Sequence, residues 1–132
     1  MVSTYDPESV NVVVDGFIIT GFADGTFVNV EQEEENYVSY VGAKGEVARS
    51  KNANKTGHIT LTLKHTSPSN AVLNRLANSK DTFAASVIDQ NDSSFTAGGP
   101  ECWIEKPASI ERGKEISERE WVIKVAELEI KE

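Results

Sequence analysis

The sequence has little of several residue types, and each shortage narrows the possible functions. Cys102 is the only cysteine among 132 residues, so no disulfide can form within the chain. No apolar run approaches the roughly 18–20 residues that a membrane-spanning helix needs. Residues 1–6 lack a basic stretch followed by an apolar one, so we predict no secretion signal. A lone thiol is more often a small buried hydrophobe than a nucleophile, and we predict burial for Cys102.

Lys and Arg are absent from residues 1–43, which hold eight acidic residues. Residues 44–80 hold seven basic residues against Glu46 alone, and residues 81–132 hold twelve acidic and six basic residues. The three blocks therefore carry net charges of −8, +6 and −6. This separation indicates charged surfaces for a partner, unless folding mixes the blocks in space. The overall charge of −8 disfavours a nucleic-acid-binding protein, which is usually basic.

Catalytic and metal-binding patterns are also missing. His58 and His65 are seven residues apart on or near one predicted strand, so they should point to opposite faces. The acidic residues within 31–35 lack the Gly and the alternating spacing of a calcium loop. Phosphate loops, G-x-S-x-G motifs and cysteine pairs do not occur. We therefore predict no enzymatic activity, no catalytic residues, no metal site and no cofactor.

Short β-prone segments separated by turn signals make up most of the chain. Residues 10–14 and 17–20 flank Asp15 and Gly16, a pair typical of a type I′ hairpin turn. Apolar and polar residues alternate through residues 57–66, as in a half-buried strand. Further strands are predicted at residues 26–32, 37–41, 81–89, 95–106 and 121–130.

Residues 68–78 are the one segment predicted to be helical. Ser67 is a favourable N-cap, and Pro68 suits the first helical position. The apolar residues within 72–76 follow helical spacing, which predicts one buried face.

Together these segments predict a mainly β fold in a single domain over residues 1–132. We expect a two-sheet β-sandwich or a partly open barrel, with one short α-helix at about residues 68–78. In the last strand, Leu128 and Ile130 are out of phase with the apolar residues of 121–125, which predicts a bulge near Ala126.

Residues 33–55 are polar, rich in charge and interrupted by turn residues. We interpret them as a long arm or extended hairpin projecting from the body; a flexible loop is the alternative. A connection of this length in a small domain is usually functional or disordered.

Three segments resemble a known family. Residues 54–73 read NKTGHITLTLKHTSPSNAVL and contain a strand, a Thr-Ser-Pro junction and a helix. With residues 5–25 and 40–50, this segment resembles the tail tube proteins of contractile-tailed bacteriophages, which also occur in prophages and tail-like bacteriocin particles. The resemblance covers about the first 80 residues in order, whereas the remainder is similar only in being acidic and β-rich.

The resemblance implies a structural subunit with two packed sheets flanked by a helix. It implies hexameric rings that stack into the hollow inner tube of a contractile tail, a conduit for DNA delivery or membrane puncture. The implied partners are copies of the chain itself, sheath, baseplate or initiator and terminator proteins, and DNA passing non-specifically through the lumen. The implied location is a virion tail or tail-like particle, made and assembled in the bacterial host cytoplasm.

Stacking of identical subunits needs two complementary patches on one chain. The acidic block at 1–43 and the basic block at 44–80 supply opposite charges, so we predict that charged residues of the arm contact neighbouring subunits. The predicted interface residues are Glu33, Glu34, Glu35, Lys44, Arg49, Lys51 and Lys55.

Two alternatives remain open from the sequence. One is a tail terminator or initiator component of related fold, which would stop at one ring. The other is a ligand- or carbohydrate-binding β-sandwich, which would present a concave aromatic surface. The aromatic candidates for such a surface are Tyr37, Tyr40, Trp103 and Trp121, of which Trp121 fits a core position better.

Overall fold

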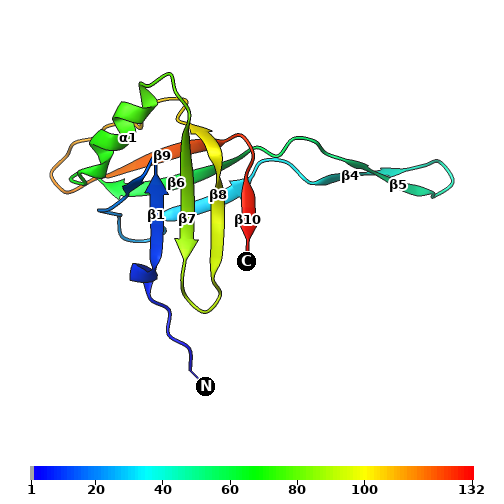
Figure 1. Ribbon diagram of the computed structural model, residues 1–132, viewed down its shortest axis with the longest axis horizontal. Helices are drawn as coiled ribbons and strands as arrows, with labels where there is room; N and C mark the ends of the chain where they lie inside the picture. The colour runs from blue at the N-terminus through cyan, green and yellow to red at the C-terminus, as the bar shows by residue number, and fades with distance from the viewer. Residues whose placement is uncertain (1) are drawn as a thin grey trace.

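The computed structural model describes residues 2–132 and shows a β-rich body from which one hairpin extends (Figure 1). The hairpin consists of β4 (Tyr37–Val41) and β5 (Val47–Lys51). The predictions of a mainly β chain and of one short helix are confirmed. The elements of the body are η1 (Pro7–Ser9), β1 (Val10–Val14), β2 (Phe17–Ile18), β3 (Val28–Gln32), β6 (Gly57–Lys64), α1 (Ser69–Ala77), β7 (Phe83–Asp89), β8 (Phe95–Trp103), β9 (Glu118–Val125) and β10 (Glu129–Lys131).

The strands of the body belong to one sheet that bends into two layers. Its order is β2-β1-β7-β8-β9-β6-β3, and β10 pairs with β8 beside this path. In Figure 1, β1, β7, β8 and β10 run roughly across the direction of β3, β6 and β9. Only two residue pairs, Cys102↔Val125 and Trp103↔Lys124, join β8 to β9. The predicted two packed sheets therefore correspond to two halves of one bent sheet. Among residues 2–132, no pairing joins its outer strands β2 and β3 to each other.

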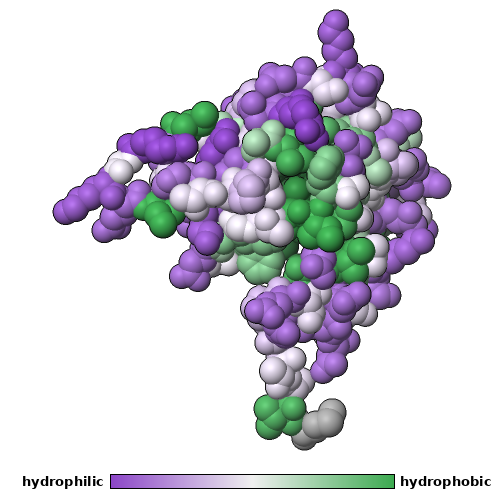
Figure 2. All heavy atoms as spheres, turned by 60° about the vertical axis from the view of Figure 1, so that its left-hand side comes forward, coloured by the Kyte–Doolittle hydropathy of each residue, from purple (hydrophilic) through white to green (hydrophobic). Residues whose placement is uncertain are grey.

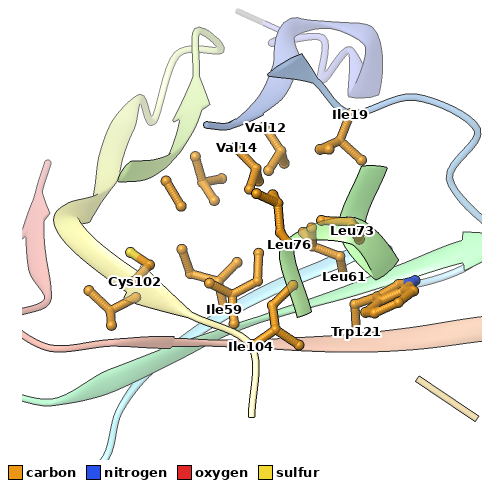
Figure 3. Close-up of a cluster of buried hydrophobic side chains, with 14 of the residues drawn as sticks. Val12, Val14, Ile19, Ile59, Leu61, Leu73, Leu76, Cys102, Ile104 and Trp121 are labelled. Atoms are coloured by element: carbon orange, nitrogen blue, oxygen red, sulfur yellow. The ribbon is translucent and has the colours of Figure 1, made fainter. Parts of the chain in front are cut away.

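The core lies between these two layers and is closed by α1. Alternate residues of β6 and β9 are buried, as the period of a half-buried strand requires. In Figure 3, Leu73 and Leu76 of α1 lie between Val12 and Val14 on one side and Leu61 on the other. The largest fully buried side chains are those of Trp121, Ile59, Leu61, Leu63, Leu73, Ile123, Val12, Val14, Val87, Val125 and Cys102.

Hydrogen bonds at the start of α1 fasten the helix to the body. The N-cap position is Pro68 and not the predicted Ser67, because α1 begins at Ser69, one residue later than expected. Ser67 still serves the start of the helix, since its Oγ accepts from the Ser69 N–H at 3.2 Å. Ser67 Oγ also donates to the Thr20 carbonyl at 2.6 Å, while Ser69 Oγ accepts from the Thr20 N–H at 3.0 Å. This pair of bonds fixes the segment after β2 against the helix.

The predicted turn at Asp15 and Gly16 is confirmed, since both have positive φ (49° and 80°) between the paired Val14 and Phe17. The C-terminal segment differs from its prediction. Instead of one bulged strand over 121–130, β9 ends at Val125 and β10 begins at Glu129. The strand is interrupted because β9 pairs with β6, whereas β10 pairs with the edge of β8. This change of partner also changes the set of side chains that face the core.

Candidate subunit interface

The β4–β5 hairpin is paired along its length and exposed on both faces. Five residue pairs join the strands, from Tyr37↔Lys51 to Val41↔Val47, and all ten strand residues are exposed. The Gly42 N–H donates to the Glu46 carbonyl at 2.7 Å to close the turn. In Figure 1 the hairpin extends to the right, away from the other elements.

The two faces of the hairpin differ in charge. Directly paired residues share a face, and successive residues alternate between faces. One face carries the basic residues, and its Arg49 guanidinium lies 4.1 Å from the centre of the Tyr37 ring. The residues of this basic face are Tyr37, Ser39, Val41, Val47, Arg49 and Lys51. The opposite face is uncharged and consists of Val38, Tyr40, Ala48 and Ser50.

Charged residues at the root of the hairpin are tied to the body. Glu33 forms an ion pair with Lys124 of β9 and accepts from Thr56 Oγ1 at 3.0 Å. His58 lies 3.7 Å from the Glu33 carboxylate and 3.5 Å from that of Glu31. The hydrogen bond from the Lys124 ammonium is the main reason why the pKa of Glu33 is lowered. Glu33 is thus engaged within its own chain.

The seven predicted interface residues fall into two separate groups. Glu33, Glu34 and Glu35 lie at the root with Lys55, whose carbonyl accepts from the Leu128 N–H at 2.9 Å. Glu34 accepts from the Asn54 side chain. The second group is Lys44 at the turn with Arg49 and Lys51 on β5. Among the ion pairs within residues 2–132, none joins a predicted basic residue of the arm to an acid.

Apolar residues of the hairpin were not among the predicted interface residues. Tyr40, Val41 and Val47 are 70%, 64% and 73% exposed. Large apolar side chains gathered on one exposed element are typical of an interaction site. The signal was present in the sequence as two β-prone segments flanking the turn at Gly42 to Gly45, but periodicity alone does not tell whether a strand is covered.

A groove of about 930 Å³ lies on the side of the body away from the hairpin. We call it the β1–β3 groove, because β1, β2, the segment at 19–27 and the start of β3 line it. Figure 2 faces this side of the molecule and shows apolar side chains gathered near its centre. The charged residues of the lining are all acidic: Glu8, Asp24 and Asp89. The sequence did not predict this groove, because residues within 5–28 form it together with Asp89 and Phe95 only in the folded chain.

The residues considered for chemistry lie apart from one another. Cys102 is fully buried, as predicted, and burial raises the pKa of its thiol, which disfavours the reactive thiolate. His65 Nδ1 accepts from the Ser117 N–H at 2.9 Å, whereas His58 lies beside the acids of β3 and the arm root. Within residues 2–132 no three His, Cys, Asp or Glu side chains gather as a metal site would need. In the same part of the chain, no helix has the length and apolarity to cross a membrane.

The aromatic candidates for a ligand surface are also dispersed. Trp121 is fully buried in the core, as predicted, and its indole N–H donates to Asn70 Oδ1 at 2.9 Å. Tyr37 and Tyr40 are on opposite faces of the hairpin. This arrangement does not favour the carbohydrate-binding alternative, which needs aromatic rings on one concave surface.

Known proteins with similar sequences are phage structural proteins. The sequence pattern of the family described as "Bacteriophage PhiTE tail tube protein" matches residues 9–98. "Structural protein ORF10" of Pseudomonas phage KPP10 is 32% identical over 136 residues, covering 92% of this chain and 77% of that protein.

Solved structures with a similar fold come from contractile injection systems and a phage-like particle. A chain of the extended sheath-tube complex of an extracellular contractile injection system (PVC) has a TM-score of 0.61 at 12% identity, covering 97% of this chain and 91% of that one. The tube-terminating cap of the anti-feeding prophage has a TM-score of 0.61 at 9% sequence identity, covering 99% of this chain and 94% of that one. A chain of the native gene transfer agent virion has a TM-score of 0.62 at 14% sequence identity, covering 98% of this chain and 100% of that one. At these identities the likeness concerns the fold alone.

The family match extends from the start of β1 into β8, and it includes the hairpin and its root. The relative from phage KPP10 extends the similarity over nearly the whole chain. This chain therefore belongs to the phage tail tube family, whose members are structural components of virion tails and tail-like particles.

Proposed function

We propose that this chain is a non-enzymatic subunit of an inner tail tube. Copies join edge to edge into rings, for which six is the expected number, and the rings stack into a hollow tube inside a sheath. The tube is the conduit for DNA delivery or membrane puncture, and initiator and terminator proteins complete its ends.

The observation that carries this proposal is the exposed hairpin. Residues 37–51 carry large apolar side chains that no element of the same chain covers within the described residues 2–132. A two-stranded hairpin alone is marginally stable in water, so it needs another surface to pack against. Contacts with other subunits supply that surface.

Free sheet edges support the proposal independently. Among the described strands, β3 pairs with β6 alone and β10 with β8 alone, so each has one edge without a strand partner. Such edges favour pairing with another chain. In a ring, each edge can pair with the next copy, so that the same contact is repeated around the axis.

The outward face of β6 and β9 offers a polar surface to a lumen. Thr60, Thr62 and Glu120 line one shallow depression there, together with Glu31 and His58. We expect such acids to repel DNA phosphates at short range, within the roughly 8–10 Å over which charges act at physiological salt. DNA would then pass without binding.

Electron microscopy of the purified full-length chain tests the proposal directly. We expect hollow rods of uniform width when the protein is concentrated, with or without a short initiating template from a tail. A chain that stays a compact monomer under both conditions, even beside its tail partners, would contradict the proposal.

The double variant Arg49→Glu/Lys51→Glu should assemble less readily than the wild type. Placing like charges against each other across an interface costs several kcal/mol, so the concentration required for assembly should rise about tenfold or more. Sedimentation of polymer against total protein concentration measures this. The matched control is Lys80→Glu/Lys114→Glu, which changes the net charge equally at exposed positions off the arm. Wild-type assembly of the arm variant, or equal loss in the control, would rule out a specific role for these charges.

A tube terminator is the second candidate function, because the terminating cap of the anti-feeding prophage shares this fold with a TM-score of 0.61. The two candidates differ in their products. A tube subunit continues to long polymers, whereas a terminator stops after one ring. The same micrographs therefore distinguish them.

A further inference from the structure

We propose that the hairpin of one copy docks into the β1–β3 groove of another copy. This inference rests on the proposed self-assembly and names the surface that receives the hairpin. It also assigns a role to a groove that lies on the opposite side of the body from the hairpin.

The β1–β3 groove has the chemistry of a receptor for a basic, partly apolar segment. Its floor offers apolar area at Ile18, which is 66% exposed, and at Phe22 and Phe27, which are only partly buried against the core. Its charged lining residues are three acids and no base. Its volume of about 930 Å³ is at the upper end of the 300–1,000 Å³ typical of pockets that enclose a ligand.

The hairpin has the complementary composition. Residues 37–51 carry Lys44, Arg49 and Lys51 against Glu46 alone, a net charge of +2. Val41 and Val47 stand opposite each other next to the turn and are largely exposed. An apolar tip flanked by basic side chains matches an apolar floor flanked by acids, because both the apolar area and the charges gain partners.

The geometry of the chain directs the hairpin to another copy rather than to its own groove. The hairpin leaves the body at the end of β6 where Gln32 pairs with Gly57, whereas the groove lies toward the end where Phe22 pairs with Leu63. Gly57 and Leu63 are six positions apart along β6, about 20 Å at 3.3 Å per residue. In Figure 1 the hairpin extends from its root away from the body. A contact between two different surfaces of identical subunits is heterologous, and repeating it builds a ring or a filament.

Disulfide cross-linking of the assembled full-length protein tests the docking. The variant Ala43→Cys/Thr26→Cys places one thiol at the hairpin turn and one in the groove lining, both at exposed positions, while the native Cys102 is buried. After assembly and mild oxidation, we expect a ladder of covalent multimers on a non-reducing gel. Mixing the two single variants should give dimers, whereas each single variant alone should give none.

The matched control is Ala43→Cys/Ser109→Cys, which moves the second thiol to an exposed loop position outside the groove. Particles that form without a ladder, or a ladder equally strong in the control, would overturn the docking while leaving the proposed function intact. Absence of particles in the wild type under all conditions would overturn both.

A charge exchange gives a second readout that does not depend on thiols. Asp24→Lys should reduce assembly. Combining it with Arg49→Glu/Lys51→Glu should restore part of the lost assembly, since the effects of substitutions at contacting residues do not add. Strictly additive losses would count against contact between Asp24 and the hairpin.

Discussion

Replacing residues 37–51 with a two-residue Asn-Gly turn should abolish tube formation and leave the body folded. The Asn52 N–H donates to the Asn36 carbonyl at 2.8 Å, so the two ends of the excised segment are already adjacent. None of the core residues lies in residues 37–51. The excision removes the basic and apolar groups proposed to contact a neighbour without opening a cavity.

Two measurements separate assembly from folding in this variant. Far-UV circular dichroism and urea unfolding should be close to those of the unassembled wild type, because the hairpin contributes little buried area. Sedimentation and microscopy should detect no polymer at concentrations where the wild type assembles. A Gly-Ser replacement of equal length at residues 109–114, an exposed loop, is the control for loss of an unrelated surface segment. Tubes formed by the shortened protein would contradict an essential role of the hairpin.

Local features of the fold were predictable because they depend on neighbouring residues. Alternation around Ile59 and Leu61 marks the buried face of β6, and the positive φ favoured by Asp15 and Gly16 places the first turn. The Ser67–Pro68 junction likewise marks the start of α1. Each of these signals depends on only a few neighbouring residues.

Features that depend on distant segments were not predictable. β8 pairs with β10 through residues 96–98 and with β9 through Cys102 and Trp103, so one strand serves both layers of the bent sheet. No local pattern encodes that change of partner. Similarly, the acids of the β1–β3 groove are brought together from three distant segments. The charge blocks predicted an acidic surface without its position, and the acids of the groove come from both the 1–43 and the 81–132 blocks.

Trp121, the largest of the fully buried side chains, should be the most sensitive single position for stability. Trp121→Ala should lower the free energy of unfolding by about 3–5 kcal/mol, the usual cost of removing a large buried aromatic side chain. Since small domains are stable by only about 5–15 kcal/mol, this is a large fraction of the total. The loss combines missing apolar contacts with an unfilled cavity beneath α1.

Polar contacts of Trp121 add to this cost. The indole N–H satisfies Asn70 Oδ1, and Asn70 also donates to the Lys64 carbonyl at 2.9 Å at the end of β6. Arg119 is only 7% exposed, and its guanidinium carbon lies 4.6 Å from the centre of the indole ring. Arg119 Nε has no hydrogen-bond partner among residues 2–132, so losing the ring removes one of the few favourable contacts of a buried cation.

The variant Trp121→Phe separates packing from hydrogen bonding. Phe retains most of the apolar volume but leaves Asn70 Oδ1 unsatisfied, for which about 1–3 kcal/mol is expected. Urea unfolding of the full-length protein at a concentration below assembly, followed by far-UV circular dichroism, measures both losses. The slope of the free energy against urea should stay constant while the midpoint falls. Equal losses for Phe and Ala would mean that the bond to Asn70 outweighs packing, and a loss below about 1 kcal/mol for Ala would contradict the central place of Trp121 in the core.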